Sequence, residues 1–98
     1  MGKVNVLYSH RLKEIAGKAE EVLEITTPSS VRDVIDRLVE RHGSSFAREI
    51  HLTSSELGQD SPFYLVFIDG KKIPESRMDD LVIHDGTQVS FLPLISGG

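Results

Sequence analysis

The stretch from Ser30 to Gly43, SVRDVIDRLVERHG, decides the fold. Its apolar residues recur at the i, i+3, i+4, i+7, i+8 spacing of one helix face, and they are Val31, Val34, Ile35, Leu38 and Val39. Ser30 is a good N-cap, and Asp33 at the third helical position can reach back to the open backbone donors. We expect Gly43 to end the helix in the left-handed cap position. Such a helix is stable only if its apolar stripe is buried.

Two strands and a short helical turn are expected before this helix, at 3–9, 21–26 and 11–16. The residues of the first strand that share one face are Val4, Val6 and Tyr8. The helical turn stops at Gly17. The second strand alternates through Val22 and Ile25, with Leu23 as an exception. Because the connection between the two strands is short, we expect an antiparallel hairpin.

More strands are expected after the helix, beyond a polar stretch at 44–62 in which residues 46–50 can form a helical turn. The run Phe63–Ile68 is the longest apolar segment. It predicts a buried strand, since a membrane span needs about 20 residues. Asp-Gly turns follow at Asp69 and Asp85. They separate the later strands, which are expected at 71–73, 81–84 and 87–95.

Strands on both sides of one amphipathic helix predict a mixed sheet packed on that helix. The helix occupies the crossover between the second strand and the strand at Phe63, which can be parallel to the first. This arrangement is a β-grasp plan, and the predicted fold class is α+β. We expect a single domain over 1–98, with residues 96–98 as a flexible C-terminal tail.

The composition narrows the classes of function. The 98-residue chain has no cysteine, which excludes disulfides, thiolate catalysis and iron–sulfur ligation by its own residues. A net charge of -4 is unfavourable for binding to the negatively charged phosphate backbone of nucleic acids, so nucleic acid is not expected as a ligand. The sequence shows neither a signal-peptide core nor an apolar run of membrane-spanning length. We therefore expect a cytoplasmic protein with no membrane partner.

No set of residues in the sequence indicates the pocket of an enzyme. The histidines are His10, His42, His51 and His84. None pairs with another at metal-ligand spacing, so solvated or half-buried side chains are the favoured interpretation and no bound metal is expected. A glycine-rich phosphate loop and a Gly-x-Ser-x-Gly nucleophile motif are also missing from the sequence. We expect no cofactor bound by the chain itself.

The closing residues Ser96-Gly97-Gly98 offer a different kind of chemistry. Residues without Cβ atoms can thread a narrow channel and present the terminal carboxylate to a nucleophile without steric cost. Gly98 is therefore the candidate reacting residue, and Gly97 permits the close approach. A bare Gly-Gly pair is equally compatible with frayed terminal residues that have no function.

The strand before these glycines carries candidate docking contacts. Alternation predicts that Val89 and Phe91 pack inward. The same alternation sends Leu92 and Leu94 outward, and neighbouring exposed apolar residues have no obvious reason in a monomer. Pro93 removes a ladder donor, which suits the point where the strand leaves the sheet. The alternative is that both leucines cover a small satellite core under the long polar loop.

Four segments carry a resemblance to a known family: Val4–Tyr8, Arg11–Gly17, Ser30–Val34 and Ile83–Gly98. Together they resemble the ubiquitin-like sulfur carriers (the MoaD/ThiS family), and most closely the small subunits of molybdopterin synthase. The closing segment, IHDGTQVSFLPLISGG, is the specific one, whereas the other three are common to β-grasp proteins. The resemblance implies a sulfur-donating subunit of a synthase rather than a stand-alone enzyme.

The resemblance also implies a chemical cycle that partner enzymes run. An adenylating enzyme, similar to ubiquitin-activating enzymes, would consume ATP and convert the Gly98 carboxylate to an acyl-adenylate. A persulfide on a sulfurtransferase would then displace AMP and leave a thiocarboxylate on Gly98. In the molybdopterin branch, the tail would insert into the large synthase subunit and deliver sulfur to a cyclic pterin precursor. The partner-binding residues implied are Leu92, Pro93, Leu94, Ile95 and Ser96.

Three alternatives use the same sequence features. A ubiquitin-like modifier would pass the activated Gly98 to a substrate lysine. A sulfur carrier for thiamine or for transfer RNA thiolation would differ only in the sulfur acceptor. A passive β-grasp interaction module would keep its function without Gly97 and Gly98.

Overall fold

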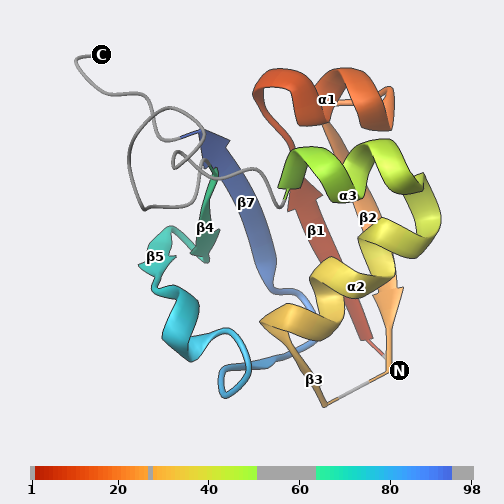
Figure 1. The fold of residues 1–98 in the computed structure, drawn as a ribbon. Helices are drawn as coiled ribbons and strands as arrows, with labels where there is room; N and C mark the ends of the chain where they lie inside the picture. The colour runs from red at the N-terminus through yellow and green to blue at the C-terminus, as the bar shows by residue number, and fades with distance from the viewer. Residues whose placement is uncertain (1, 27, 51–63, 94–98) are drawn as a thin grey trace.

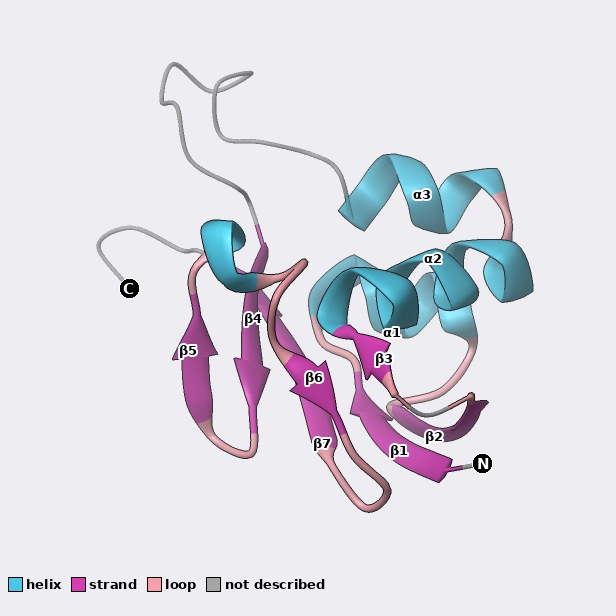
Figure 2. Cartoon of the chain, turned by 90° about the horizontal axis from the view of Figure 1, so that it is seen from below, coloured by secondary structure: helices cyan, strands magenta, loops and turns pink. Residues whose placement is uncertain are grey.

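A computed structural model describes residues 2–26, 28–50 and 64–93 of the chain. In chain order the elements are β1 (Gly2–Leu7), α1 (His10–Ala16), β2 (Glu20–Ile25), β3 (Ser29–Ser30), α2 (Val31–His42), α3 (Ser44–Ile50), β4 (Tyr64–Ile68), β5 (Lys71–Ile73), a 3-10 turn (Glu75–Arg77), β6 (Val82–Ile83) and β7 (Gln88–Pro93). Within the described ranges, a mixed sheet has the order β2-β1-β7-β4-β5, and β3 pairs with β6 (Figure 1, Figure 2). This architecture confirms the predicted α+β class and the β-grasp fold.

The strand parallel to β1 is β7 and not the strand at residue 63, which the sequence had suggested for that place. β1 pairs with β2 in antiparallel and with β7 in parallel orientation, and β4 runs antiparallel to β7. Parallel pairing requires a long crossover connection between the two strands. The chain between β1 and β7, which includes α2, is long enough to provide it. The segment after α2 places β4 one strand further across the sheet, and β7 fills the gap between β4 and β1.

Helix α2 follows the predicted bounds and capping closely. The Asp33 N–H donates to Ser30 Oγ at 3.1 Å, and the Ser30 N–H donates to Asp33 Oδ2 at 3.0 Å, which forms a complete capping box. The buried residues of its stripe are Val31, Val34, Ile35 and Leu38. Gly43 ends the helix, but with φ 90° and ψ -166° it lies outside the left-handed helical region that the sequence predicted. The positive φ still favours glycine at this position.

Strand β2 faces the core with different residues than its apolar pattern suggested. Leu23 is 2% exposed, whereas Val22 is 52% exposed on the opposite face. The reason is the antiparallel register, which sets Leu23 opposite Val4 of β1, so the two side chains share the core face. Alternation then sends Glu21 inward with Leu23, and a carboxylate in that position disguised the pattern in the sequence.

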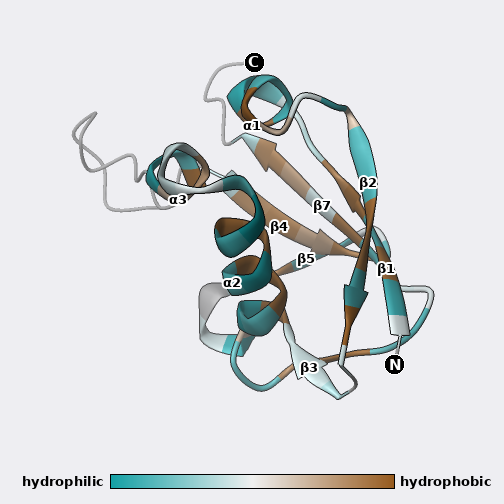
Figure 3. Ribbon diagram, turned by 90° about the vertical axis from the view of Figure 1, so that its right-hand side faces the viewer, coloured by the Kyte–Doolittle hydropathy of each residue, from teal (hydrophilic) through white to brown (hydrophobic). Residues whose placement is uncertain are grey.

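The helices cover only one face of the sheet. Helices α2 and α3 lie along that face, and α1 packs against α3. The apolar sides of the helices are turned toward the sheet (Figure 3). Phe46 of α3 and Leu12 of α1 are fully buried there. The presence of α3 confirms the helical turn predicted at 46–50. None of the described helices is long and apolar enough to span a membrane. The other sheet face carries no described helix (Figure 3).

Candidate functional site

Strand β7 leads directly to the predicted reactive residues, and hydrogen bonds hold it near both ends. At its start, the Lys3 N–H donates to Asp85 Oδ1 at 2.8 Å, and the Gly86 N–H donates to the Lys3 carbonyl oxygen at 2.8 Å. Near its end, the Ser9 hydroxyl donates to the Phe91 carbonyl oxygen at 2.5 Å. Because β7 is also paired with strands on both sides, it is a rigid base for the residues that follow.

The side chains of β7 alternate between the two sheet faces as predicted. Val89 and Phe91 are fully buried on the helix-covered face, and Leu92 is 43% exposed on the open face. This orientation confirms that Leu92 points outward. The alternative of a satellite core involves Leu94 and the polar loop, which lie largely outside the described residues. The role of Leu92 as a docking contact stays a prediction.

Leu92 is part of an apolar surface on the open sheet face. The register sets Leu65 of β4 opposite Leu92, and Phe67 opposite Ser90. Leu7 of β1 is opposite Ser90 on the other side. Cross-strand partners share a face, so these side chains gather around the end of β7. We call Leu7, Leu65, Phe67 and Leu92 the open-face patch; the first three are each half-buried.

Sequence reasoning missed Leu65 and Phe67 as surface residues, because it interpreted the run from residue 63 to 68 as a buried strand. Only Tyr64 and Val66 of β4 are fully buried. The number of predicted helices could have indicated this exposure, since one main helix covers only one face of a sheet. A strand with six apolar residues in such a sheet must present about half of them to the open face.

The other predicted site residues are only partly within the described part of the chain. Pro93 is the last described residue of β7 and is half-buried opposite Tyr64. The remaining predicted residues, Leu94, Ile95, Ser96, Gly97 and Gly98, lie outside the described residues. The structure therefore places Leu92 on the open face, whereas Pro93 shares the opposite face of the sheet with Tyr64.

A buried tyrosine anchors the strand beside Pro93 to two helices. The Tyr64 hydroxyl donates to Glu49 Oε2 of α3 at 2.7 Å, and Arg11 Nε of α1 lies 3.5 Å from Glu49 Oε1. Burial raises the pKa of Tyr64, and the hydrogen bond to the Glu49 carboxylate raises it further. The hydroxyl stays protonated and can keep donating, so this contact holds β4 in place below the end of β7.

A second buried carboxylate joins β1, β2 and α2. Glu21 Oε1 accepts from the Tyr8 hydroxyl at 2.5 Å and lies 2.8 Å from His42 Nε2. Its Oε2 lies 3.4 Å from Lys18 Nζ and 3.5 Å from Arg41 Nε. Burial acts to raise the pKa of Glu21, but the hydrogen bonds from Tyr8 and His42 outweigh it and hold that pKa below its usual value. Burial also raises the pKa of Tyr8.

Neither carboxylate cluster indicates catalysis. Glu21 Oε1 is held by Tyr8 and His42, whereas the buried Oε2 has no hydrogen-bond partner among the described residues and lies only within ion-pair distance of Lys18 and Arg41. These partners come from neighbouring elements, which is the pattern of a structural contact. Across residues 2–26, 28–50 and 64–93, no three histidine, aspartate or glutamate side chains converge in a way that could hold a metal ion. What the described residues show is a partly exposed apolar surface, next to the strand that leads to residues 94–98.

Comparison with known proteins bears on the family and the fold of the chain. The ThiS family model matches residues 6–98. No curated protein matches the sequence.

Solved structures with the same fold cover nearly all of the chain. The "Putative molybdopterin converting factor, subunit 1" of Pyrococcus furiosus is 25% identical, with 97% of this chain and 100% of that chain covered and a TM-score of 0.75. The small archaeal modifier protein 1 of Methanosarcina acetivorans is 24% identical over 100% and 98% of the two chains, with a TM-score of 0.74. A chain of the BexX/CysO complex of Amycolatopsis orientalis is 23% identical over 97% and 99%, with a TM-score of 0.66.

Proposed function

The chain belongs to the ThiS family of ubiquitin-like sulfur carriers, and from that premise we propose that it carries sulfur as a thiocarboxylate on Gly98 for molybdopterin synthesis. The observation that carries this proposal is the open-face patch, which gathers around the strand that leads to Gly97-Gly98. The molybdopterin assignment draws on the similar chain from Pyrococcus furiosus, whose name is that of a molybdopterin converting factor subunit.

The proposed chemistry has three steps, all at the C-terminal carboxyl group. A Gly98 carboxylate oxygen attacks the α-phosphorus of ATP in the adenylating enzyme, which releases pyrophosphate and leaves an acyl-adenylate. The terminal sulfur of a persulfide attacks the acyl carbon and expels AMP. A second thiol of the sulfur donor then cleaves the sulfur–sulfur bond, which leaves the thiocarboxylate on Gly98 and a disulfide on the donor. The chain has no cysteine, so no thiol of its own competes in these exchanges.

The open-face patch would supply the binding energy for these encounters. Ordering a chain terminus inside a partner costs about 1–2 kcal/mol per residue in backbone entropy. Burial of the exposed part of Leu92 alone recovers about 1 kcal/mol, so the partner has to cover the patch as a whole. We therefore propose that the adenylating enzyme and the large subunit of molybdopterin synthase both dock on this patch, in turn.

The first test is the intact mass of the protein after incubation with ATP, its adenylating enzyme and a persulfide donor. The proposal expects a gain that matches the exchange of one oxygen for one sulfur, confined to the C-terminal peptide. A second incubation, with the large synthase subunit and the cyclic pterin precursor, should return the original mass and yield the dithiolene product. An unchanged mass in the first incubation, with partners active on another carrier, would favour the interaction module.

A second candidate is protein modification, which the similarity to a small archaeal modifier protein favours. The same activated Gly98 would then react with a lysine amine and form an isopeptide bond. Detection of Gly-Gly remnants on lysines of other proteins, lost when Gly98 is deleted, would support this activity. Thiocarboxylate formation and conjugation are measured on different products, so each can be accepted or rejected separately.

A further inference from the structure

The outer edge of β2 has no strand paired with it in the part of the chain that the structure describes. Among the described strands, β2 pairs only with β1. The Asn5 N–H donates to the Thr87 carbonyl oxygen at 2.9 Å, away from β2, so Asn5 and its partner Val22 form a non-hydrogen-bonded pair. In an antiparallel ladder such pairs alternate with bonded ones. The N–H and C=O groups of Glu20, Val22 and Glu24 therefore point to the open edge.

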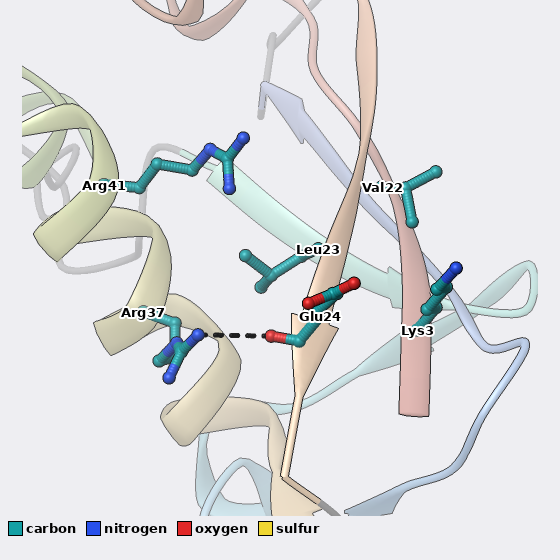
Figure 4. A pocket seen from close by; sticks show the side chains of 6 residues that line it. All are labelled: Lys3, Val22, Leu23, Glu24, Arg37 and Arg41. Atoms are coloured by element: carbon teal, nitrogen blue, oxygen red, sulfur yellow. Dashed lines mark hydrogen bonds between the residues drawn. The ribbon is translucent and has the colours of Figure 1, made fainter. Parts of the chain in front are cut away.

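A groove runs between this edge and helix α2. It has a volume of about 380 Å³ and is lined by Lys3, Val22, Leu23, Glu24, Arg37 and Arg41 (Figure 4). Both arginines reach from α2 toward β2. Arg37 Nη2 donates to the Glu24 carbonyl oxygen at 3.3 Å, and Arg41 Nε lies 3.5 Å from Glu21 Oε2 with 52% of its side chain exposed. Arg37 thus occupies a carbonyl oxygen that an added strand would use.

We propose that an extended acidic segment of a partner protein adds to β2 as a further strand, with its carboxylates on Arg37 and Arg41. The two arginines are one helical turn apart, a rise of about 6 Å. Alternate residues of a strand are about 6.6 Å apart, so two acidic side chains at positions i and i+2 match this spacing. The incoming N–H replaces Arg37 at the Glu24 carbonyl oxygen and frees the guanidinium for a carboxylate.

Charge complementarity selects an acidic partner over a second copy of this chain. Antiparallel pairing of two β2 edges about a two-fold axis would set the arginines of both copies on one face of the joint sheet. The same pairing would set Glu20 and Glu24 of both copies on the other face. Like charges opposite each other destabilise a strand pair, so self-pairing is disfavoured on both faces. A segment with acidic residues toward α2 and basic residues toward Glu20 and Glu24 complements both.

The groove lies at the β2 edge of the sheet, and β1 separates β2 from β7. Lys3 is near the start of β1, and β7, which is parallel to β1, ends at Pro93 at the other end of the sheet (Figure 1). A partner held in the groove leaves the open-face patch and the C-terminal residues accessible. The inference goes beyond the proposed sulfur chemistry and does not depend on it.

The test uses the full chain and two fluorescent peptides, Lys-Asp-Val-Asp-Val-Asp-Lys and the same peptide with asparagine in place of each aspartate. Fluorescence anisotropy should show that the aspartate peptide binds at least tenfold more tightly. Arg37→Gln and Arg41→Gln should each weaken its binding about two- to fivefold, as expected for exposed ion pairs. Arg48→Gln removes the same charge from the exposed side of α3 and should have no effect.

Amide hydrogen exchange identifies the mode of binding. The bound aspartate peptide should protect the amides of Glu20, Val22 and Glu24 and leave those of Glu21 and Leu23 unchanged. Val22→Pro removes an edge donor and should abolish binding, whereas deletion of Gly97 and Gly98 should not alter it. Equal binding of the two peptides, an unaltered affinity in Arg37→Gln, protection centred on Leu92, or β2-mediated self-association would each overturn the proposal.

Discussion

Replacing Leu92 with aspartate removes an apolar contact from the centre of the open-face patch. Full burial of a leucine side chain contributes about 1.5–3 kcal/mol, so covering a Leu92 that is 43% exposed contributes about 1 kcal/mol. A carboxylate at this position would also be buried without a partner in the interface, at a cost of about 1–3 kcal/mol. The total of about 2–4 kcal/mol corresponds to a rise in Kd of about 30- to 1000-fold.

The assay is calorimetric titration of the adenylating enzyme and of the large synthase subunit with wild type and Leu92→Asp. Val22→Asp is the matched control, because Val22 is an exposed apolar residue of the same sheet face but lies outside the patch. Both variants should keep the wild-type circular dichroism spectrum, since each changes an exposed position. Wild-type affinity of Leu92→Asp for both partners would refute the docking assignment, and an equal loss in Val22→Asp would show that the effect is not local.

Deletion of Gly98 should abolish the oxygen-to-sulfur mass gain while the free energy of unfolding in urea stays unchanged, because the residue lies beyond the last described strand; a destabilised variant would contradict this. Glu21→Gln should lower the free energy of unfolding at pH 7 by about 1–3 kcal/mol, since the amide cannot retain every donor around the buried carboxylate. The pKa of Glu21 is lower in the folded state than in the unfolded state. Its ionisation therefore stabilises the protein at pH values above the ordinary pKa of glutamate, and this stabilisation is lost as the pH falls through the lowered pKa of the folded state. Urea titrations from pH 7 to pH 3 should therefore show a weaker acid dependence in Glu21→Gln than in wild type, and parallel curves would exclude the assignment. Gly43→Ala should lower the free energy of unfolding by about 1–2 kcal/mol, because φ is 90° at this position. Backbone strain alone would cause the loss, since no atom of the described residues lies within 4 Å of the added Cβ. An unchanged thermal midpoint would argue that the helix end rearranges.

The local features of this fold were predictable because the residues that determine them are neighbours in the sequence. The capping box of α2 depends on Ser30 and Asp33, three residues apart, and the helix follows at once from the spacing of its apolar stripe. The Asp-Gly turn at Asp69 is equally local, and the structure has it with positive φ at Asp69 and Gly70.

Features that depend on pairing between distant segments were not predictable in the same way. The side of β2 that faces the core is set by its register with β1, and a buried Glu21 cannot be foreseen without Tyr8 and His42 beside it. The parallel partner of β1 was misassigned for the same reason. Leu92 was recognised as outward-facing because β7 alternates, but the patch around it needed the pairing with β4.

The central position of β7 has a consequence for how the molecule is made. The Ser9–Phe91 hydrogen bond joins residues that are 82 apart in the sequence, so the middle of the sheet closes through one of the longest loops the chain can form. Until β7 pairs with β4, Leu65 and Leu92 are not neighbours and the open-face patch is not formed. A chain that is truncated before β7, or in which β7 has not yet paired, therefore lacks the complete open-face patch.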